Sequence, residues 1–340
     1  MSLLVIGAPQ ALAAAVFAAT TSGERVHVLA EAAPQTLPAR AELDGVRHDI
    51  RLSSSLEGAE LHACVIVAES RRLQDLVLEH REILAGLPVL LAPGGLAGAL
   101  RVSAMDTSLL VAETTGFPVS GAIDGDTFTL RGIKHSMPFA SVDEQLAPTL
   151  CEEFRRYLPH LVVSDLRTTS LSNTNHIIHP PITLMNAARI DSATPFTLYR
   201  EGVSDALENL LRAVDEERRE VCRAVGADDR SGRDWLHGFY HRDGMEGSTF
   251  VDCLTSYPGF ADVHGPTTLD YRYLADDVPY GVAGWAEVGR RFGVATPRID
   301  HLLAVLSTLA PEIDLRADED GLDLFLEHVQ QHRPAPVPHR

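Results

Sequence analysis

The segment SLSNTNHIIHPPITLMNAARID, from Ser170 to Asp191, contains the residues of this sequence best suited to acid–base chemistry. It is an apolar, helix-like stretch with several amides and two histidines, and two prolines directly follow His179. A proline inside a helix removes a backbone donor and clashes with the preceding turn. We therefore expect the helix to kink or break beside His179 and to leave backbone carbonyls and the imidazole available.

His179 also has simpler interpretations. A histidine beside prolines in an apolar stretch is often a hydrogen-bonded structural residue. His176 and His179 are separated by three positions and could share a metal ion, but the sequence presents no third ligand. We therefore expect no metal site.

This segment resembles the signature of the opine dehydrogenase family, in which a catalytic histidine precedes proline and the helix ends in an N-A-G-R-I-E-like run, here Asn186 to Asp191. A second resemblance lies in Asp270 to Leu309, where family members have an R-Y-L-x-E-D-V-P-Y-G-L pattern followed by further helices. Two weaker matches, Leu90 to Leu100 and Val111 to Pro118, resemble the family's P-G-x-x-G-G and A-E-T segments.

The resemblance implies roles for particular residues. His179 would be the acid–base group, and Asp277 would hydrogen-bond its imidazole and fix the tautomer. Arg272 would bind a substrate carboxylate through its planar guanidinium, and Asn175 and Tyr280 would complete the substrate site. The implied reaction joins an amino acid and an α-keto acid as an imine, which receives hydride from NAD or NADP to give a secondary amine dicarboxylate.

Ordinary interpretations remain open for the same positions. Asp277 could be a loop or helix-cap residue before Val278 and Pro279, and Asp276 could take the role assigned to it. Arg272 could form a surface ion pair with a neighbouring acid, which contributes little free energy.

The first predicted turn departs from the pattern of a dinucleotide site. It reads GAPQAL from Gly7 to Leu12, where GxGxxG is usual, so only the first glycine is kept. Pro9 has no N–H for a phosphate, and Leu12 is bulky where helix and cofactor normally approach each other. From position and resemblance, the residues expected to contact a cofactor are Gly7, Ala8, Gln10, Glu31 and Glu113.

The expected function is therefore an opine dehydrogenase-like oxidoreductase that uses NAD or NADP. The altered turn motivates an alternative without any cofactor, in which His179 and Asp277 catalyse condensation, cyclisation or hydrolysis of an amino-acid-derived carboxylate. A non-catalytic binding protein is the third hypothesis. The expected partners are small amino and keto acids, and the family suggests a homodimer.

The elements that must position these residues fall into two groups. Apolar runs at Ser2 to Gly7, Arg25 to Leu29, Leu61 to Ala68 and Leu87 to Ala92 alternate with helical patterns, which predicts a parallel sheet. Turn residues between β-formers predict a hairpin from Phe117 to Ile133. The predicted fold class is α/β, with a Rossmann-like parallel-sheet domain (residues 1–150), a mainly α-helical domain (151–331) and a loose tail (332–340).

Composition excludes several classes of function. The formal net charge of -18 disfavours binding to nucleic acid or to an anionic membrane surface. The apolar opening stretch is interrupted by Gly7, Pro9 and Gln10, so it predicts a strand, a turn and a helix rather than a membrane span. The cysteines are scattered without any CxxC pair, as expected for reduced thiols in the cytoplasm.

Overall fold

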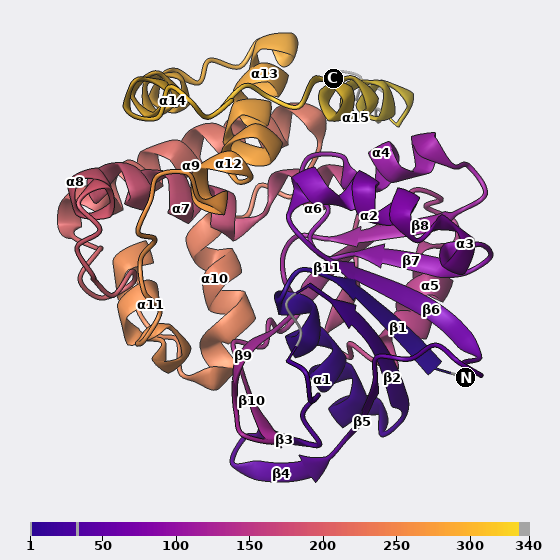
Figure 1. The fold of residues 1–340 in the computed structure, drawn as a ribbon. Helices are drawn as coiled ribbons and strands as arrows, with labels where there is room; N and C mark the ends of the chain where they lie inside the picture. The colour runs from indigo at the N-terminus through magenta and orange to yellow at the C-terminus, as the bar shows by residue number, and fades with distance from the viewer. Residues whose placement is uncertain (1, 32–33, 333–340) are drawn as a thin grey trace.

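The first half of the chain forms an eight-stranded sheet in the order β12–β11–β8–β7–β6–β1–β2–β5 (Figure 1). In chain order the strands are β1 (Ser2–Gly7), β2 (Arg25–Ala30), β5 (Arg51–Ser53), β6 (Leu61–Val67), β7 (Pro88–Leu91), β8 (Leu110–Thr114), β11 (Met137–Ser141) and β12 (Leu161–Val163). Neighbouring strands are parallel except β8 and β11. The structure is a computed structural model and describes residues 2–31 and 34–332.

Helices cover both faces of this sheet. Leu3 and Val5 of β1 pack on the side of α1 (Gln10–Ser22), whereas Leu4 and Ile6 pack on the opposite side. That opposite layer contains α2 (Leu73–Glu79), α3 (Arg81–Leu84) and α4 (Gly98–Met105), and α5 (Ala147–Arg155) lies on the side of α1. Because both faces are buried, the strands are continuous apolar runs, which made them recognisable in the sequence.

A smaller four-stranded sheet, in the order β4–β3–β10–β9, lies beside α1. The antiparallel strands β9 (Ser120–Asp124) and β10 (Thr127–Arg131) confirm the predicted hairpin. The strands β3 (Arg40–Leu43) and β4 (Val46–Asp49) were not predicted, because they are short and mostly exposed and therefore lack an apolar pattern.

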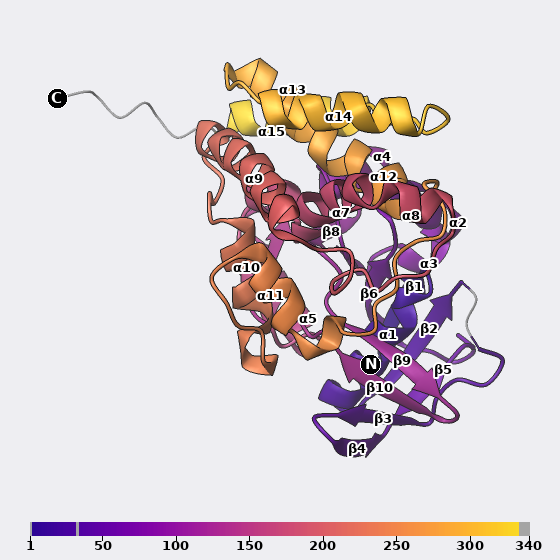
Figure 2. The ribbon, with the colours of Figure 1, turned by 90° about the vertical axis from the view of Figure 1, so that its left-hand side faces the viewer.

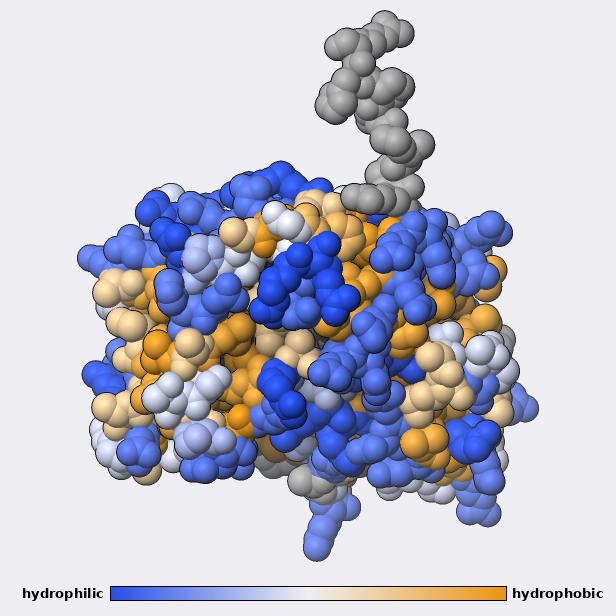
Figure 3. Space-filling view, turned by 90° about the horizontal axis from the view of Figure 1, so that it is seen from above, coloured by the Kyte–Doolittle hydropathy of each residue, from blue (hydrophilic) through white to orange (hydrophobic). Residues whose placement is uncertain are grey.

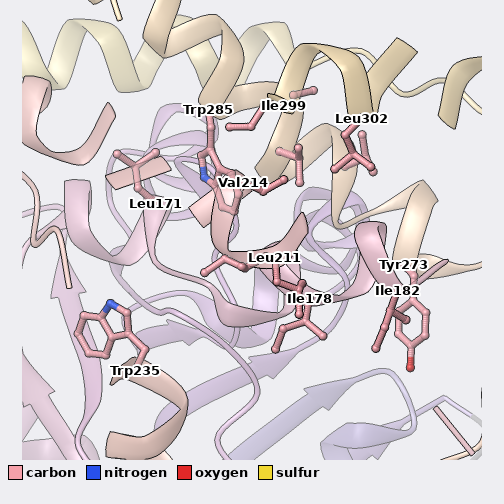
Figure 4. Close-up of a cluster of buried hydrophobic side chains, with 14 of the residues drawn as sticks. Leu171, Ile178, Ile182, Leu211, Val214, Trp235, Tyr273, Trp285, Ile299 and Leu302 are labelled. Atoms are coloured by element: carbon pink, nitrogen blue, oxygen red, sulfur yellow. The ribbon is translucent and has the colours of Figure 1, made fainter. Parts of the chain in front are cut away.

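The second half is helical and has its own hydrophobic core. Its helices are α6 (Leu166–Leu171), α7 (Thr174–Met185), α8 (Ala187–Asp191), α9 (Asp205–Val225), α10 (Gly232–Tyr240), α11 (Phe250–Ser256), α12 (Arg272–Ala275), α13 (Ala283–Phe292), α14 (Pro297–Leu309) and α15 (Glu319–Gln331). Figure 4 shows how Ile178 of α7, Val214 of α9 and Trp285 of α13 meet in this core. None of the described helices is both long and apolar enough to span a membrane.

The predicted domain boundary needs correction. A boundary between residues 150 and 151 falls inside α5, and β12 behind that helix still pairs with β11. The sheet half therefore extends to Val163, and the helical half begins at α6. The local pattern of α5 does not distinguish a helix that covers a sheet from a helix of the following bundle. Most of the predicted tail, residues 333–340, lies outside the described residues.

The helix was expected to kink or break beside His179, and it does not break. Helix α7 continues from Thr174 to Met185 with Pro180 and Pro181 inside it. Two backbone hydrogen bonds are lost there, but the helix is buried against α9 and α12 along most of its length. Tertiary packing thus holds a helix that the local sequence disfavours.

The face formed by α13, α14 and α15 contains a separate hollow of about 750 Å³. Figure 3 shows this face of the molecule, where hydrophilic residues dominate and hydrophobic ones gather between them. The hollow is lined in part by Arg290, Asp314 and Arg316, and none of the predicted site residues lines it.

Candidate active site

The predicted histidine and aspartate meet in the structure. Nδ1 of His179 lies 2.6 Å from Oδ2 of Asp277, and both side chains are buried. His179 lies in α7, and Asp277 directly precedes a π-helical turn, Val278–Val282. Because Nδ1–H donates to the carboxylate, the tautomer is fixed and Nε2 is the unprotonated ring nitrogen.

Asp276 is not the partner of His179. Its Oδ1 accepts a hydrogen bond of 3.0 Å from the backbone N–H of Arg71, in the loop that follows β6. This resolves the alternative that the sequence left open. Asp276 instead connects the sheet half to the helical half, and Asp277 orients the imidazole.

Two tyrosines, Tyr199 and Tyr273, contact His179 directly, although the sequence motifs did not assign either of them to it. The hydroxyl of Tyr199 lies 2.8 Å from Nε2 of His179, and the ring of Tyr273 stacks on the imidazole with centroids 3.9 Å apart. Burial raises the pKa of Tyr199 well above its usual range, so its hydroxyl stays protonated and donates to Nε2. Tyr199 lies in the loop between α8 and α9, where no pattern in the sequence marks it.

Burial also controls the charge of the His179–Asp277 pair. Burial, with the positive charges of Arg272 and Lys134, lowers the pKa of His179 well below its usual range. Burial raises the pKa of Asp277 to about 6, although His176 and Arg272 act in the opposite direction. At neutral pH the pair therefore holds a neutral imidazole beside an ionised carboxylate, which is the state of a general base.

Arg272, the first residue of α12, lies beside this pair. Its guanidinium carbon is 5.0 Å from the centroid of the Tyr273 ring, the same ring that stacks on His179, and 5.5 Å from that of Phe117. Nε is buried without a hydrogen-bond partner, and no carboxylate among residues 2–31 and 34–332 forms an ion pair with this side chain. The alternative of a surface ion pair is therefore excluded for the described residues, and the guanidinium is available to a carboxylate.

A lysine that we did not predict belongs to the same cluster. Lys134 lies between β10 and β11 and is 6% exposed. Burial, and then the charge of Arg272, lowers its pKa to about 8, and the charge of Lys134 in turn acts on His179. The sequence distinguishes this residue, because Lys134 is the only lysine of the chain and the other 28 of its 29 lysine and arginine residues are arginines.

Asn175 and Tyr280, the two remaining predicted substrate residues, make contacts with the protein itself. Asn175 is half-buried in the first turn of α7, where its N–H donates to the capping side chain of Asn173. Asn173 itself is buried, and its amide donates to Nε2 of His176 at 3.0 Å. The ring of Tyr280 lies against the guanidinium of Arg101, 4.7 Å away, so this placement argues against the predicted substrate role of Tyr280.

Several N–H groups of the predicted cofactor turn already form hydrogen bonds within the protein. Gly7 has φ +133°, and a Cβ there would lie 2.2 Å from the carbonyl oxygen of Val67, so only glycine fits between β1 and β6. The N–H of Ala8 donates to that same carbonyl oxygen. Ala11 donates to Ala8 and Leu12 to Pro9, so fewer N–H groups remain for a phosphate than in a usual dinucleotide turn.

A hollow of about 490 Å³ nevertheless lies beside this turn, at the carboxyl ends of β1 and β2. Gln10 and Glu31 line it together with β9. Glu31 forms an ion pair of 3.3 Å with Arg72, at the position where an acid commonly binds the adenosine ribose.

The prediction that Glu113 contacts a cofactor needs correction. It is fully buried and accepts hydrogen bonds from the hydroxyl groups of Thr169 and Ser170 and from the N–H of Ala99. Burial raises its pKa to about 7. Its carboxylate is thus used by the protein itself, to join the end of β8 to α6 of the helical half.

These contacts place the cluster around His179 at the junction of the two halves. The carboxyl ends of three neighbouring strands contact the helical half. The loop after β6 contacts Asp276, the loop after β7 contacts Tyr280, and a side chain of β8 contacts Thr169. Figure 2 gives a second view of this junction. In open parallel sheets, ligands bind at this edge. The fold and the site together therefore define a two-domain protein in which a Rossmann-like sheet domain and a helical domain meet around a buried histidine–aspartate pair.

Comparison with known proteins gives the family. Residues 162–310 match the family model described as "NAD/NADP octopine/nopaline dehydrogenase, alpha-helical domain". An opine dehydrogenase of Arthrobacter sp. (strain 1C) is 32% identical over 246 residues, which cover 70% of this chain and 67% of that protein. The chain belongs to the opine dehydrogenase family and is an opine dehydrogenase-like oxidoreductase. Vitopine synthase of Allorhizobium ampelinum is 28% identical over 57% of this chain and 53% of its own length.

Solved structures show the same fold at low sequence identity. Octopine dehydrogenase with NADH and L-arginine superposes with a TM-score of 0.70 at 15% identity, over 100% of both chains. Yersinopine dehydrogenase with NADP+ has a TM-score of 0.65 at 12% identity, over 98% of this chain and 99% of that one. They confirm the predicted fold class, a Rossmann-like domain followed by a helical domain.

Proposed function

We propose that this protein condenses an amino acid with an α-keto acid and reduces the resulting imine with NADH or NADPH. The observation that carries the proposal is the buried pair of His179 and Asp277 beside an arginine that no described carboxylate neutralises. The relatives support the choice of reactants, because octopine dehydrogenase has been solved with NADH together with L-arginine or with pyruvate.

Each side chain has a defined task in this reaction. Arg272 binds a substrate carboxylate and orients the keto carbon toward Nε2 of His179. As the amine adds to that carbon, Nε2 takes one proton from the nitrogen and gives it to the oxygen, and it then transfers the second nitrogen proton in the same way, so that the oxygen leaves as water and the C=N bond forms. Asp277 stabilises the imidazolium that forms between these steps. A bound nicotinamide cofactor would supply the hydride that, together with one proton, converts the imine to a secondary amine.

The hollow beside the first turn fits the adenosine end of such a cofactor. Gln10 would contact it, and Glu31 would accept hydrogen bonds from ribose hydroxyl groups. Gly7 and Ala8 form the turn at its edge. Because Pro9 has no N–H and the N–H groups of Ala11 and Leu12 are already bonded, the diphosphate would be held by fewer hydrogen bonds than in relatives with a GxGxxG turn.

The test is consumption of NADH and NADPH in mixtures of single amino acids and α-keto acids, with the product identified by mass. We expect a product that contains both acids joined through one nitrogen. Arg272→Lys keeps the charge but loses the two-pronged hydrogen bonding, so it should raise KM for one acid more than it lowers kcat. Failure of every mixture, together with failure to bind either cofactor, would reject the proposal.

A second candidate function uses the same pair without a cofactor. The hydrogen bonds of Ala11 and Leu12 within the first turn favour it, because they leave the turn poorly suited to phosphate. In that case His179 and Asp277 would transfer protons in a condensation, cyclisation or hydrolysis of an amino-acid-derived carboxylate. Calorimetric titration of NADH and NADPH distinguishes the two candidates, since this one requires that neither binds.

A further inference from the structure

Three side chains that the proposed reaction does not use meet at the C-terminal end of α15. His328 lies in the last turn of this helix, and His332 directly follows its last residue. Glu144 lies in the sheet half, in the turn between β11 and α5. One possible ligand atom from each of the three residues lies within 4.8 Å of the other two. Folding therefore gathers two imidazoles and a carboxylate at a place separate from His179.

His328 has a buried nitrogen that the protein itself does not satisfy. The residue is 5% exposed, and its Nε2 has no hydrogen-bond partner among residues 2–31 and 34–332. Oε1 of Glu144 lies 3.9 Å from this nitrogen, which is too far for a hydrogen bond. Burial lowers the pKa of His328, so the imidazole is neutral at pH 7, the form that binds metal ions. A metal ion would satisfy an atom that is otherwise costly to bury.

The imidazole of His332 is oriented by a hydrogen bond to the helix. Its Nδ1 lies 2.9 Å from the carbonyl oxygen of His328. Because a carbonyl oxygen only accepts, Nδ1 carries the proton and Nε2 keeps the lone pair that a metal ion needs. The two imidazole rings lie beside each other, with centroids 4.2 Å apart, as expected four positions apart on one helix face. A capping role would explain this hydrogen bond but would leave Nε2 of His328 unsatisfied.

The charges near the two histidines are compatible with a bound cation. The side chain of Glu144 is 47% exposed, so its carboxylate can turn toward an ion without disturbing the core. Asp165 and Arg167 also act on His328, but they form an ion pair of 3.1 Å with each other and add little net charge. The group therefore offers two neutral nitrogens and one anionic oxygen.

We propose that Glu144, His328 and His332 bind one zinc ion, with a water molecule as the fourth ligand. Two imidazole nitrogens and a carboxylate oxygen are donors that zinc accepts in tetrahedral geometry. Bonds of about 2.1 Å place such donors about 3.4 Å apart, so small rotations of the two exposed side chains complete the site.

The zinc ion fastens the C-terminal end of α15 to the sheet half. The helix lies against α4 of the sheet half (Figure 1). At its other end, the capping residue Asp318 forms an ion pair of 3.6 Å with Arg101 of α4. With zinc bound to Glu144, both ends of α15 are held by charged groups of the sheet half.

Calorimetric titration of zinc chloride into the full chain, dialysed first against a chelator, tests the site. We expect one tight equivalent of zinc and no comparable binding of Mg²⁺, which prefers oxygen ligands. His332→Ala and Glu144→Gln should each weaken zinc binding at least about tenfold, and both side chains are exposed, so the variants should fold. The matched control is His301→Ala, which removes an exposed histidine from α14 and should change nothing. Absence of zinc binding, or native affinity in both variants, would overturn the proposal.

Hydrogen exchange tests whether zinc connects the two halves. Zinc should slow the exchange of amides in α15 and raise the melting temperature by at least about 3 °C in the native protein. Neither effect should occur in Glu144→Gln. A site formed by the two histidines alone would keep tight binding and slow exchange in Glu144→Gln, and that result would overturn the three-ligand site. These measurements use neither substrate nor nicotinamide cofactor, so their outcome is independent of the proposed function.

Discussion

The backbone N–H of Asp277 donates to the carbonyl oxygen of Arg272 at 3.0 Å. This hydrogen bond spans five residues, one more than in an α-helix, and it leads directly into the π-helical turn that follows. The carboxylate of Asp277 bonds His179, and the guanidinium of Arg272 lies on Tyr273, which stacks on His179. One short segment thus places a carboxylate and a guanidinium group around the same imidazole.

The first prediction concerns the tautomer of His179. Asp277→Asn keeps the shape of the side chain, but its amide can donate to Nδ1 and so favours the wrong tautomer. We expect kcat to fall about 10²- to 10⁴-fold with cofactor binding unchanged, as measured by steady-state kinetics and calorimetry. Asp276→Asn is the matched control and should keep kcat near the native value, because its Oδ1 can still accept from Arg71. Equal losses in both variants would contradict the assignment of Asp277.

The second prediction concerns the hydroxyl of Tyr199. Tyr199→Phe keeps the ring against Phe260 but leaves Nε2 of His179 buried without its donor. We expect unfolding to become about 1–3 kcal/mol easier by urea titration, and kcat to fall about tenfold. Tyr271→Phe should change neither quantity, because Tyr271 is 41% exposed. A Tyr199→Phe protein with native stability and native kcat would show that the hydrogen bond to Nε2 is unimportant.

The third prediction concerns the first turn. Pro9→Gly adds an N–H and removes a ring beside the cofactor hollow, so NADH or NADPH should bind about tenfold more tightly by calorimetry. Pro9→Ala restores the N–H but keeps a Cβ, which separates the effect of the donor from that of bulk. Leu12 stays unchanged, because it is buried and its loss would leave a cavity. Unchanged affinity in both variants would show that Pro9 does not limit cofactor binding.

The fourth prediction concerns stability and pH. Burial raises the pKa of Glu113 from 4.5 to about 7, so the folded protein holds a proton that the unfolded chain releases in this range. The contribution of Glu113 to the free energy of unfolding is fully present below pH 4.5 and is lost as pH rises through about 7. The total loss is about 3 kcal/mol. Urea unfolding at several pH values should show a shallower decline in Glu113→Gln. Burial also raises the pKa of Asp276 to about 7, so Asp276 would cause part of the decline that remains in this variant. A native protein that becomes more stable over this range would contradict the sign.

The sequence by itself determined the alternation of strands and helices through β1, β2, β6 and β7, because strands buried on both faces and amphipathic helices leave local patterns. The strands β5, β11 and β12 of the same sheet were not predicted. The motif around His179 and the segment from Arg272 to Asp277 likewise indicated the two parts of the site by resemblance to a family. The end of the sheet domain escaped this reasoning, because α5 has the same local pattern as the helices of the second half.

Only the tertiary structure decided which side chains meet. It chose Asp277 over Asp276 as the partner of a histidine 98 positions away, and it brought Tyr199 and Lys134 to the same site without any motif. It also kept α7 continuous through two prolines and turned Glu113 toward α6. The physical reason is that local patterns record which residues are buried, whereas hydrogen bonds and charge interactions between distant segments depend on how the two halves pack against each other.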